Sequence, residues 1–305
     1  MQRLLIDTDT ASDDAVALLM ALRAPDAVVE AITVVAGNVP LDRAVQNALY
    51  VRDLVGSEVP VHAGCAAPIL RPLRTAEETH GQDGMGDIGL DLSDRVPDAG
   101  HGADVLAERL LADPGALTLV TLGPLTNLAV ALLRHPELVD AMGGCVCMIG
   151  TGSGPGNSTP TAEFNAWVDP EAARVVLQSG LRATFVGWDI SCSDAVIDPE
   201  TEAELRALGT PVARFAMDIQ RQVAKLATTS QGLAGFDLPD PIAMAVALDP
   251  SSAVAARRPV TVVVGDDPEA GRLDVDWDAP ESGTISTVTH ADRAAFLTRL
   301  RAALS

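Results

Sequence analysis

Four aspartates lie close together near the N-terminus in the stretch IDTDTASDD, which contains Asp7, Asp9, Asp13 and Asp14. A helix that begins near Asp13 would stabilise carboxylates in its first turn, but only by about 0.3–1 kcal/mol each. This stabilisation is too small to offset the repulsion among four like charges. The stretch therefore predicts a bound cation, and its oxygen ligands, with no Cys or His nearby, favour a hard ion such as Ca²⁺ or Mg²⁺.

The elements around this stretch predict where the aspartates lie. Residues 3–6 are apolar and suit a strand, residues 8–12 are typical of a turn, and residues 13–24 have helical periodicity that ends at Pro25. In open α/β sheets, ligands bind beyond the carboxyl ends of the strands. Successive helical residues point about 100° apart, so Asp13 and Asp14 are expected to face different partners.

The alternation of strand and helix continues along the chain. Further buried strands are expected at 28–36, 58–64, 116–123, 145–150 and 183–191, and further helices at 41–55, 124–136, 169–177, 198–227 and 242–248. Antiparallel strands are expected at 259–265, 272–278 and 283–289, before a closing helix. This order predicts an α/β fold with an open, mostly parallel central sheet (Rossmann-like), flanked by helices, with a small antiparallel strand addition near the C-terminus. No linker divides residues 1–305, so one domain is expected.

Composition limits the partners. The 305 residues include 21 Lys and Arg against 42 Asp and Glu, a net charge of -21. Polyanions need clustered Lys and Arg, so no nucleic-acid polymer is expected to bind, although a neutral nucleoside is compatible with this charge. No charged n-region precedes an apolar stretch, and the apolar run 15–22 is too short to span a bilayer. A cytoplasmic protein without a membrane partner is expected.

DTDT after an apolar strand has a second interpretation. It could be the aspartyl nucleophile motif of haloacid dehalogenase-like phosphatases. That family also needs a later Lys or Arg for the phosphate and an acidic pair after a strand. Lys225 lies in a helix-like stretch, and no such acidic pair is evident in the middle of the chain.

A more specific resemblance rests on five segments together: DTDTASDD, VVAGN, LGPLTNLA, AEFNAWVDPEAA and LPDPIAMAVALDP. In order and approximate spacing, over nearly the whole chain, they resemble the inosine-uridine preferring nucleoside hydrolase family. The resemblance implies an enzyme, an N-glycosyl hydrolase that splits ribonucleosides into free base and ribose. It also implies a Ca²⁺ ion at the strand ends that binds the ribose 2′- and 3′-hydroxyls, and a homodimer or homotetramer.

The resemblance further implies roles for single residues. Asp9 would be the general base that takes a proton from the attacking water. The calcium ligands would be the carboxylates of Asp9, Asp14 and Asp240 and the backbone carbonyl of Leu122. The ribose hydroxyls would be bound by Asp13, Asn38, Asn157, Glu163 and Asn165. A turn residue after a strand is the alternative interpretation of Asn38, and a helix cap is the alternative for the AEFNAWVDP segment.

The chain departs from the family pattern on the side of the leaving base. Many members have His before the last metal-binding Asp, where it can protonate the departing base, but Pro239 stands there in this chain. His80, in HGQDGMGD, is the best remaining candidate to contact the base, with a loop-stabilising role as its alternative. Weaker candidates are Asp83, Gln231 and Asp237, while Trp167 and Trp188 could stack on a base or pack in the core. Ser12 is expected to cap the first helix.

Two other functions remain open at this level. Because the family His is absent, the chain could bind ribose or a nucleoside without hydrolysing it. It could also hydrolyse a different ribosyl compound, such as a nicotinamide riboside or modified-base riboside. The base preference cannot be predicted from the sequence.

Overall fold

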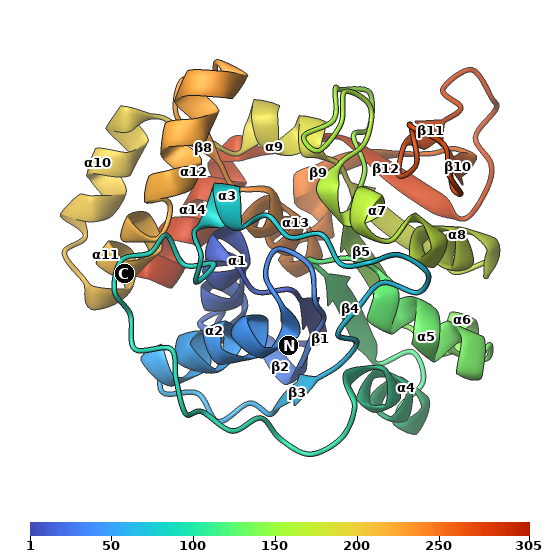
Figure 1. Ribbon diagram of the computed structural model, residues 1–305, viewed down its shortest axis with the longest axis horizontal. Helices are drawn as coiled ribbons and strands as arrows, with labels where there is room; N and C mark the ends of the chain where they lie inside the picture. Colours follow the sequence, from blue (N-terminus) through green and yellow to red (C-terminus); the bar gives the residue numbers. More distant parts are fainter.

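An eight-stranded sheet runs through the computed structural model, which describes residues 1–305 apart from the side chains of Ser230 and Gln231 (Figure 1). The strand order is β3-β2-β1-β4-β5-β6-β12-β9, and every neighbouring pair is parallel except β12 and β9. The strands are β1 (Gln2–Thr8), β2 (Ala27–Val34), β3 (Val61–Ala63), β4 (Leu117–Thr121), β5 (Gly144–Met148), β6 (Ala183–Val186), β12 (Ile285–Ala291) and β9 (Ala253–Arg257).

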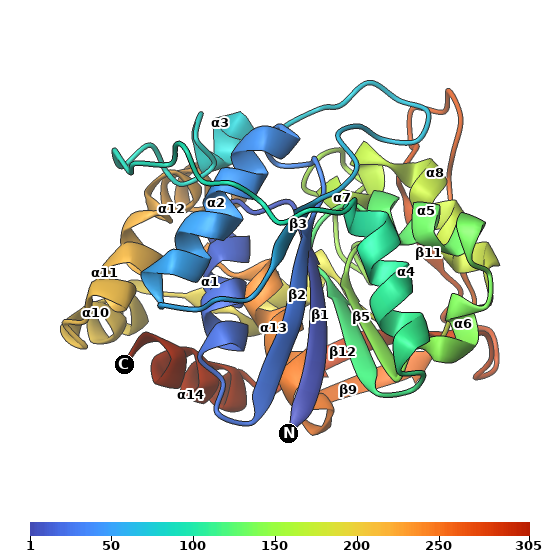
Figure 2. The same cartoon turned by 90° about the horizontal axis from the view of Figure 1, so that it is seen from below.

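Helices cover both faces of the sheet (Figure 2). One face carries α1 (Ser12–Leu22), α2 (Leu41–Leu54), α13 (Pro239–Leu248) and α14 (Arg293–Leu304). The other face carries α4 (Gly102–Ala112), α5 (Thr126–Arg134), α6 (Leu138–Ala141) and α8 (Pro170–Gln178). Strand β1 supplies both cores by the two-residue alternation of a strand: Leu4 and Ile6 join one hydrophobic cluster and Leu5 joins the other. The sheet is therefore buried on both sides, as parallel sheets require.

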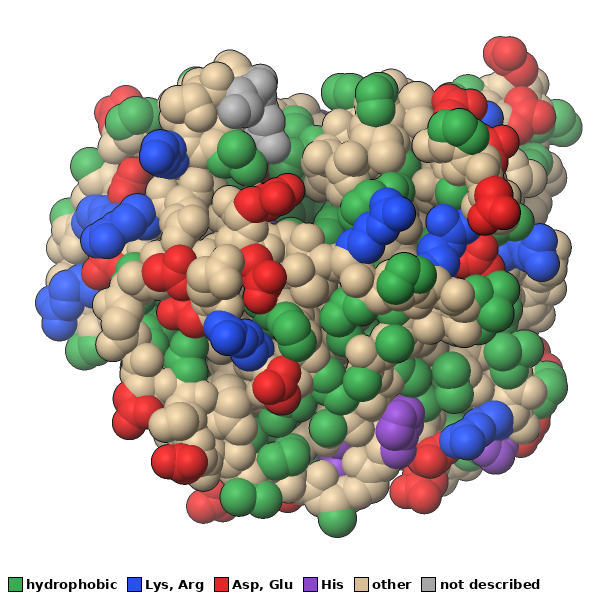
Figure 3. All heavy atoms as spheres, in the orientation of Figure 1, with side chains coloured by type: hydrophobic (Ala, Val, Ile, Leu, Met, Phe, Trp, Pro, Cys, Tyr) green, Lys and Arg blue, Asp and Glu red, His purple; other side chains and the backbone are tan. Residues whose placement is uncertain are grey.

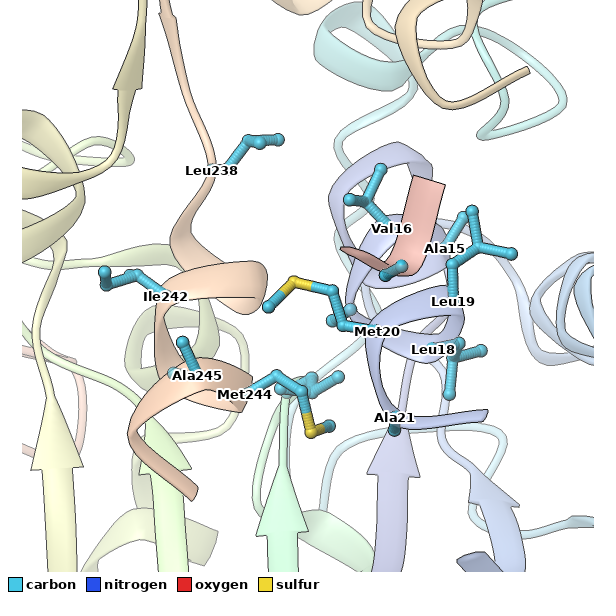
Figure 4. Close-up of a cluster of buried hydrophobic side chains, with 14 of the residues drawn as sticks. Ala15, Val16, Leu18, Leu19, Met20, Ala21, Leu238, Ile242, Met244 and Ala245 are labelled. Carbon is cyan, nitrogen blue, oxygen red and sulfur yellow. The ribbon is translucent and has the colours of Figure 1, made fainter. Parts of the chain in front are cut away.

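Helices α1 and α13 pack against each other beside the sheet, as the cluster in Figure 4 shows. Met20 and Leu19 of α1 and Ile242 and Met244 of α13 are at most 2% exposed. Both helices begin with aspartates, and both are apolar over the rest of their length. This packing fixes Asp13 and Asp14 of one helix relative to Asp240 of the other.

Short elements surround the carboxyl edge of the sheet, which faces the viewer in Figure 1. They include the helices α3 (Glu77–His80), α7 (Phe164–Val168), α9 (Trp188–Asp194) and α12 (Arg221–Leu226). The helices α10 (Pro199–Ala207) and α11 (Pro211–Asp218) lie farther from this edge, and α11 contacts α14. A π-helical turn (Ala227–Gln231) follows α12, and a 3₁₀ turn (Pro250–Ser252) follows α13. Two small antiparallel pairs complete the fold: β7 (Val196–Ile197) with β8 (Phe236–Asp237), and β10 (Val260–Val262) with β11 (Leu273–Val275).

The predicted fold class is confirmed, with differences in detail. The strand expected at 283–289 is β12, which runs parallel to β6 inside the main sheet and is antiparallel only to β9. The helical region expected at 198–227 is three helices, because Gly209 adopts a left-handed φ of 70° after α10 and the chain turns again at Gln220 after α11. Within the described residues, no helix is long and apolar enough to cross a membrane.

Candidate active site

The main pocket lies at the point where the sheet order reverses. Strand β1 pairs with β2 on one side and with β4 on the other, so the connections that leave β1 and β4 diverge. Such a switch point is the usual ligand site of an open α/β sheet. Leu122 follows β4 and donates its backbone N–H to the carbonyl of Asp7, so the ends of the two strands are held together. Eight predicted site residues line the pocket: Asp13, Asn38, His80, Leu122, Asn157, Glu163, Asn165 and Asp240.

Figure 3 looks onto this edge of the molecule, where acidic and basic side chains are interspersed without a single large patch of either sign. The strong concentration of negative charge is inside the pocket rather than on this surface. Asp9, Asp14 and Asp240 are at most 3% exposed, and Asp13 is 8% exposed. The acidic cluster of these four residues is therefore a buried feature that the total charge does not explain.

The carboxylates of the acidic cluster lie close to one another. Carboxylate oxygens of Asp13, Asp14 and Asp240 lie within 4.8 Å of one another. Among the side chains that the structure describes, no Lys or Arg forms an ion pair with the cluster. Oδ1 of Asp9 and Oδ1 of Asp13 are buried without a hydrogen-bond partner. These oxygen donors fit a hard cation, which supplies the missing positive charge.

Burial and mutual repulsion raise the pKa values of carboxyl groups in the acidic cluster. Burial, followed by the charge of Asp14, raises the pKa of Asp9 and of Asp240 well above the ordinary value. The same two causes raise the pKa of Asp13 to about 7. Without a cation, the folded protein therefore holds protons that an unfolded chain would release.

Asp14 is positioned by the turn that joins β1 to α1. Thr8 Oγ1 donates to Asp14 Oδ1, and the backbone N–H of Ala11 donates to Asp14 Oδ2 at 2.9 Å. The expectation that Ser12 caps this helix is wrong, because the N-cap is Ala11 and the carboxylate of Asp14 satisfies its N–H. Ser12 Oγ instead lies 2.8 Å from Nδ1 of His80.

Two glycines surround the carboxylate of Asp9. The backbone N–H of Asn38 donates to Asp9 Oδ2 at 2.6 Å. A Cβ atom on Gly37 would lie 2.1 Å from Oδ2, and one on Gly123 would lie 2.6 Å from Oδ1. Any side chain at either position would therefore displace Asp9.

For the ribonucleosides and the general-base role of Asp9 that the family resemblance implies, replacing Gly37 by alanine is expected to lower kcat/KM by at least about tenfold, because a misplaced reacting group is costly even at small displacements. Steady-state ribose release measures the effect. Gly56→Ala is the matched control, since no atom lies within 4 Å of its Cβ position and only the positive φ of 65° opposes alanine. Equal activity of the two variants would contradict the close packing around Asp9.

Asp7, at the end of β1, is held by hydrogen bonds from Thr33 and Asn127. Thr33 Oγ1 and Asn127 Nδ2 both donate to Asp7 Oδ1, the latter at 2.8 Å. Asn127 also donates to the carbonyl of Val34 and accepts from the N–H of Cys65. It thus joins the ends of β1, β2 and β3. The sequence patterns did not single out Asn127, although its place at the start of a helix after a strand was a usable signal.

The other polar side chains come from the segments after β4 and β5. Glu163 caps α7 by accepting from the N–H of Asn165 at 2.7 Å, and it also accepts from the N–H of Gly150 at 3.0 Å. Asn165 Nδ2 donates to the carbonyls of Leu122 and Met148 at 2.7 and 3.0 Å. The helix-cap interpretation of this segment holds for Asp169, which caps α8 by accepting from the N–H of Ala172, and the structure adds Glu163 as a second cap that also lines the pocket. Burial raises the pKa of Glu163 to about 7.

Three of the residues predicted to contact a base, His80, Trp188 and Asp237, line the pocket. His80 lines the pocket, with Nδ1 3.7 Å from Asp13 Oδ1, and burial lowers its pKa to about 4. Trp188 and Asp237 also line the pocket.

The remaining candidates do not line this pocket where the structure describes them. Asp83 binds the N–H groups of its own loop and lines a separate hollow. Trp167 lies beneath Arg74 rather than in the pocket lining, and the side chain of Gln231 is outside the described part of the structure.

The fold and the pocket define an α/β protein with a carboxylate-lined polar site at its strand ends. The family model described as inosine-uridine preferring nucleoside hydrolase matches residues 4–298. The chain belongs to this family. The predicted family and the predicted class of enzyme, a nucleoside ribohydrolase, are thus confirmed, and the family leaves no place for the aspartyl-phosphatase interpretation of DTDT.

Individual relatives cover nearly the whole chain. The chain is 34% identical to an inosine-uridine preferring nucleoside hydrolase of Leishmania major over 289 residues, 94% of this chain and 91% of the relative. It is 34% identical to the pyrimidine-specific ribonucleoside hydrolase RihB of Escherichia coli, over 89% of this chain and 86% of the relative. A purine-preferring ribonucleoside hydrolase from Gardnerella vaginalis has a similar structure, with a TM-score of 0.91, 30% identity, and coverage of 99% of this chain and 98% of that one.

Proposed function

We propose that this chain hydrolyses ribonucleosides to free base and ribose, with Asp9 as the general base and a Ca²⁺ ion held in the acidic cluster. The observation that carries this proposal is the acidic cluster itself, a set of buried carboxylates without a basic partner that opens into a pocket lined by Asn and Glu side chains. A sugar with several hydroxyls suits such a lining, because each hydroxyl both donates and accepts hydrogen bonds.

Asp9, Asp14, Asp240 and the backbone carbonyl of Leu122 would hold the ion. The carboxylate oxygens that lie within 4.8 Å of one another belong to Asp13, Asp14 and Asp240, and Asp9 is fully buried but is not part of this group of three. Ca²⁺ accepts six to eight oxygen ligands in a flexible geometry, which suits a mixed set of carboxylates, one carbonyl and sugar hydroxyls. When bound, the ion supplies positive charge that acidifies water and orients the ribose diol.

Asp9 has one oxygen available for proton transfer. Its Oδ2 accepts the N–H of Asn38, while its Oδ1 has no partner among the described residues. We assign Oδ1 the role of taking a proton from the water that attacks C1′ of the ribose. A positioned general base typically contributes a factor of about 10²–10⁴ to the rate.

Asp13 and the amide side chains would bind the sugar. Asp13 Oδ1 is buried without a partner, so it can accept a hydrogen bond from the 2′-hydroxyl. Both hydrogens of the Asn165 amide are occupied by backbone carbonyls, which leaves its oxygen to face positive charge that develops on the sugar. Asn38, Asn157 and Glu163 would bind the remaining hydroxyls.

Calcium is expected to stabilise the protein more at pH 8 than at pH 5.5. Because burial raises the carboxyl pKa values of the cluster, the folded, calcium-free protein binds more protons than the unfolded chain between about pH 4 and 7. Its stability should therefore fall as pH rises through that range, while calcium binding becomes stronger. At 100 times Kd, a ligand adds about 2.7 kcal/mol. Thermal unfolding with chelator or calcium at both pH values tests this, and a chelated protein that is more stable at pH 8 would contradict it.

A panel of nucleosides tests the reaction. The relatives are described by different preferences, inosine-uridine, pyrimidine-specific and purine-preferring, so their names do not fix the base for this chain. Ribose release from purine, pyrimidine, nicotinamide and modified-base ribosides should identify at least one substrate, and Asp9→Ala should abolish its turnover. Tight nucleoside binding by calorimetry without turnover, with calcium present, would instead favour a non-catalytic binder.

We further propose that residues 1–305 form one domain, that the protein is cytoplasmic, and that it assembles as a homodimer or homotetramer. These proposals are supported by the continuity of the family match over residues 4–298 and by the family resemblance. Light scattering coupled to size-exclusion chromatography measures the assembly, and a monomer at micromolar concentration would contradict that part of the proposal.

A further inference from the structure

Two carboxyl groups in the pocket, those of Glu163 and Asp237, are separate from the acidic cluster, and only Asp237 comes from the side built by α9, α12 and β8. Asp237 lies in β8, which pairs with β7 and contacts α12. Its side chain lines the pocket beside Pro239 and is 1% exposed. The elements on this side of the pocket contribute the apolar side chains of Trp188, Val223 and Leu226. A flat, largely apolar nucleobase fits these neighbours, whereas the ribose hydroxyls fit the Asp, Asn and Glu side chains of the other elements.

Asp237 has one free oxygen and one supported oxygen. Oδ1 is buried and has no hydrogen-bond partner among the side chains that the structure describes. Oδ2 lies 2.6 Å from Ser191 Oγ, and the same hydroxyl lies 2.8 Å from the carbonyl oxygen of Trp188. The single hydrogen of Ser191 can therefore point to Asp237 when the carboxyl is charged, or to the carbonyl when the carboxyl is neutral. The environment accommodates both protonation states, as a proton donor requires.

The other titratable groups around the base side are less suited to proton donation. Nδ1 of His80 is engaged with Ser12, and burial disfavours the charged form of the ring. Cys192 contacts Asp237 only weakly, with Sγ 4.0 Å from Oδ2. Burial raises the pKa of Asp237 to about 6, with Asp13 adding a smaller contribution of the same sign, so a useful fraction of the carboxyl is protonated near neutral pH.

We propose that Asp237 hydrogen-bonds the leaving base and gives it a proton as the C1′–N bond breaks, an inference that rests on the ribohydrolase function proposed above. The electron pair of that bond stays on the base, and the proton on Asp237 moves to a ring nitrogen or carbonyl oxygen of the base. Water forms the new bond to C1′, and its proton moves to Asp9. One carboxyl loses a proton and another gains one, and exchange with solvent restores both. Ser191 is a positioning residue in this scheme.

The test compares leaving groups that need a proton with one that does not. Asp237→Asn keeps the size of the side chain and a hydrogen bond to Ser191 but removes the acidic proton. For the best natural nucleoside and for phenyl β-D-ribofuranoside, kcat/KM is expected to fall by about 10²–10⁴-fold, the usual contribution of a general acid. For 4-nitrophenyl β-D-ribofuranoside, whose phenolate leaves unprotonated, the loss should stay within about threefold. Phenols lack a ring N–H, so a lost contact to such a group cannot produce this difference.

Matched variants complete the experiment. Ser191→Ala should show a smaller loss with the same dependence on the leaving group. Asp249→Asn, at the opposite end of α13 and bound only to Ser251, should leave both substrate classes unchanged. An equal loss on all substrates in Asp237→Asn, or unchanged nucleoside hydrolysis, would overturn the role of Asp237. Failure of the wild-type protein to release ribose from any nucleoside or aryl riboside would instead overturn the proposed function on which it rests.

Discussion

Replacing Asp9 by asparagine is expected to lower kcat for nucleosides by at least about a thousandfold, within the range that a general base contributes. The amide oxygen of the substituted side chain could still accept the N–H of Asn38, so the packing between Gly37 and Gly123 is kept. The variant loses the only group in the proposed mechanism that accepts a proton from water. It also loses one negative charge that the cation needs.

The measurement is single-turnover ribose release at saturating calcium, which removes differences in calcium affinity from the comparison. Asp249→Asn is again the matched control, because it makes the same chemical change at a carboxylate that binds only its own turn. Activity of the Asp9→Asn variant within tenfold of the wild type would contradict the assignment of Asp9 as the base.

The Asp240→Asn variant is expected to be more stable than the wild type without calcium and less stable than the wild type with calcium. Without calcium, the wild-type protein contains buried carboxyl groups whose pKa values are raised by burial and repulsion, and removal of one of them relieves that cost at pH 8. The chelated variant should therefore melt at a higher temperature than the chelated wild type. With calcium, the wild type should gain about 2.7 kcal/mol at 100 times Kd, and the variant should gain much less.

Differential scanning calorimetry of both proteins at pH 8, with chelator and with calcium, measures this reversal. Asp42→Asn, at the exposed N-terminus of α2, is a suitable control because it lies outside the acidic cluster. A wild type that melts above the Asp240→Asn variant in chelator would show that the cluster is stabilised without a cation, and the proposed metal site would be wrong.

The sequence predicted the parallel core of the fold because that core depends on local patterns. Apolar runs such as 3–6 and 145–150, each followed by a helical pattern, specify a buried strand and its crossover without knowledge of the tertiary structure. Strand β9 was missed because its sequence, AVAAR, lacks β-branched alternation and most of it is not buried. The β7–β8 pair was missed because strands of two residues form only where distant segments meet.

In the candidate site, too, local sequence patterns predicted some residues, whereas others come together only through contacts between distant segments. The proposed metal and ribose side depends on residues that follow individual strands, so the motifs around Asn38, Glu163 and Asp240 predicted residues that line one pocket, whereas Asp9 and Asp14 are fully buried and are not part of its lining. The proposed base side is built by α9, α12 and β8, whose relative placement depends on how separate helices pack. The sequence could name Asp237 only as a weak candidate, since its burial and its contact with Ser191 exist only in the folded protein.

The central claim is that the buried acidic cluster holds a calcium ion that the hydrolysis of ribonucleosides requires. Its most direct test is the initial rate of ribose release by the chelator-treated wild-type protein, measured with its best nucleoside as calcium is added back. Almost no release is expected without calcium, and a saturable recovery is expected as calcium is added, parallel to the gain in thermal stability. Full activity in excess chelator, with no change on adding calcium, would contradict it.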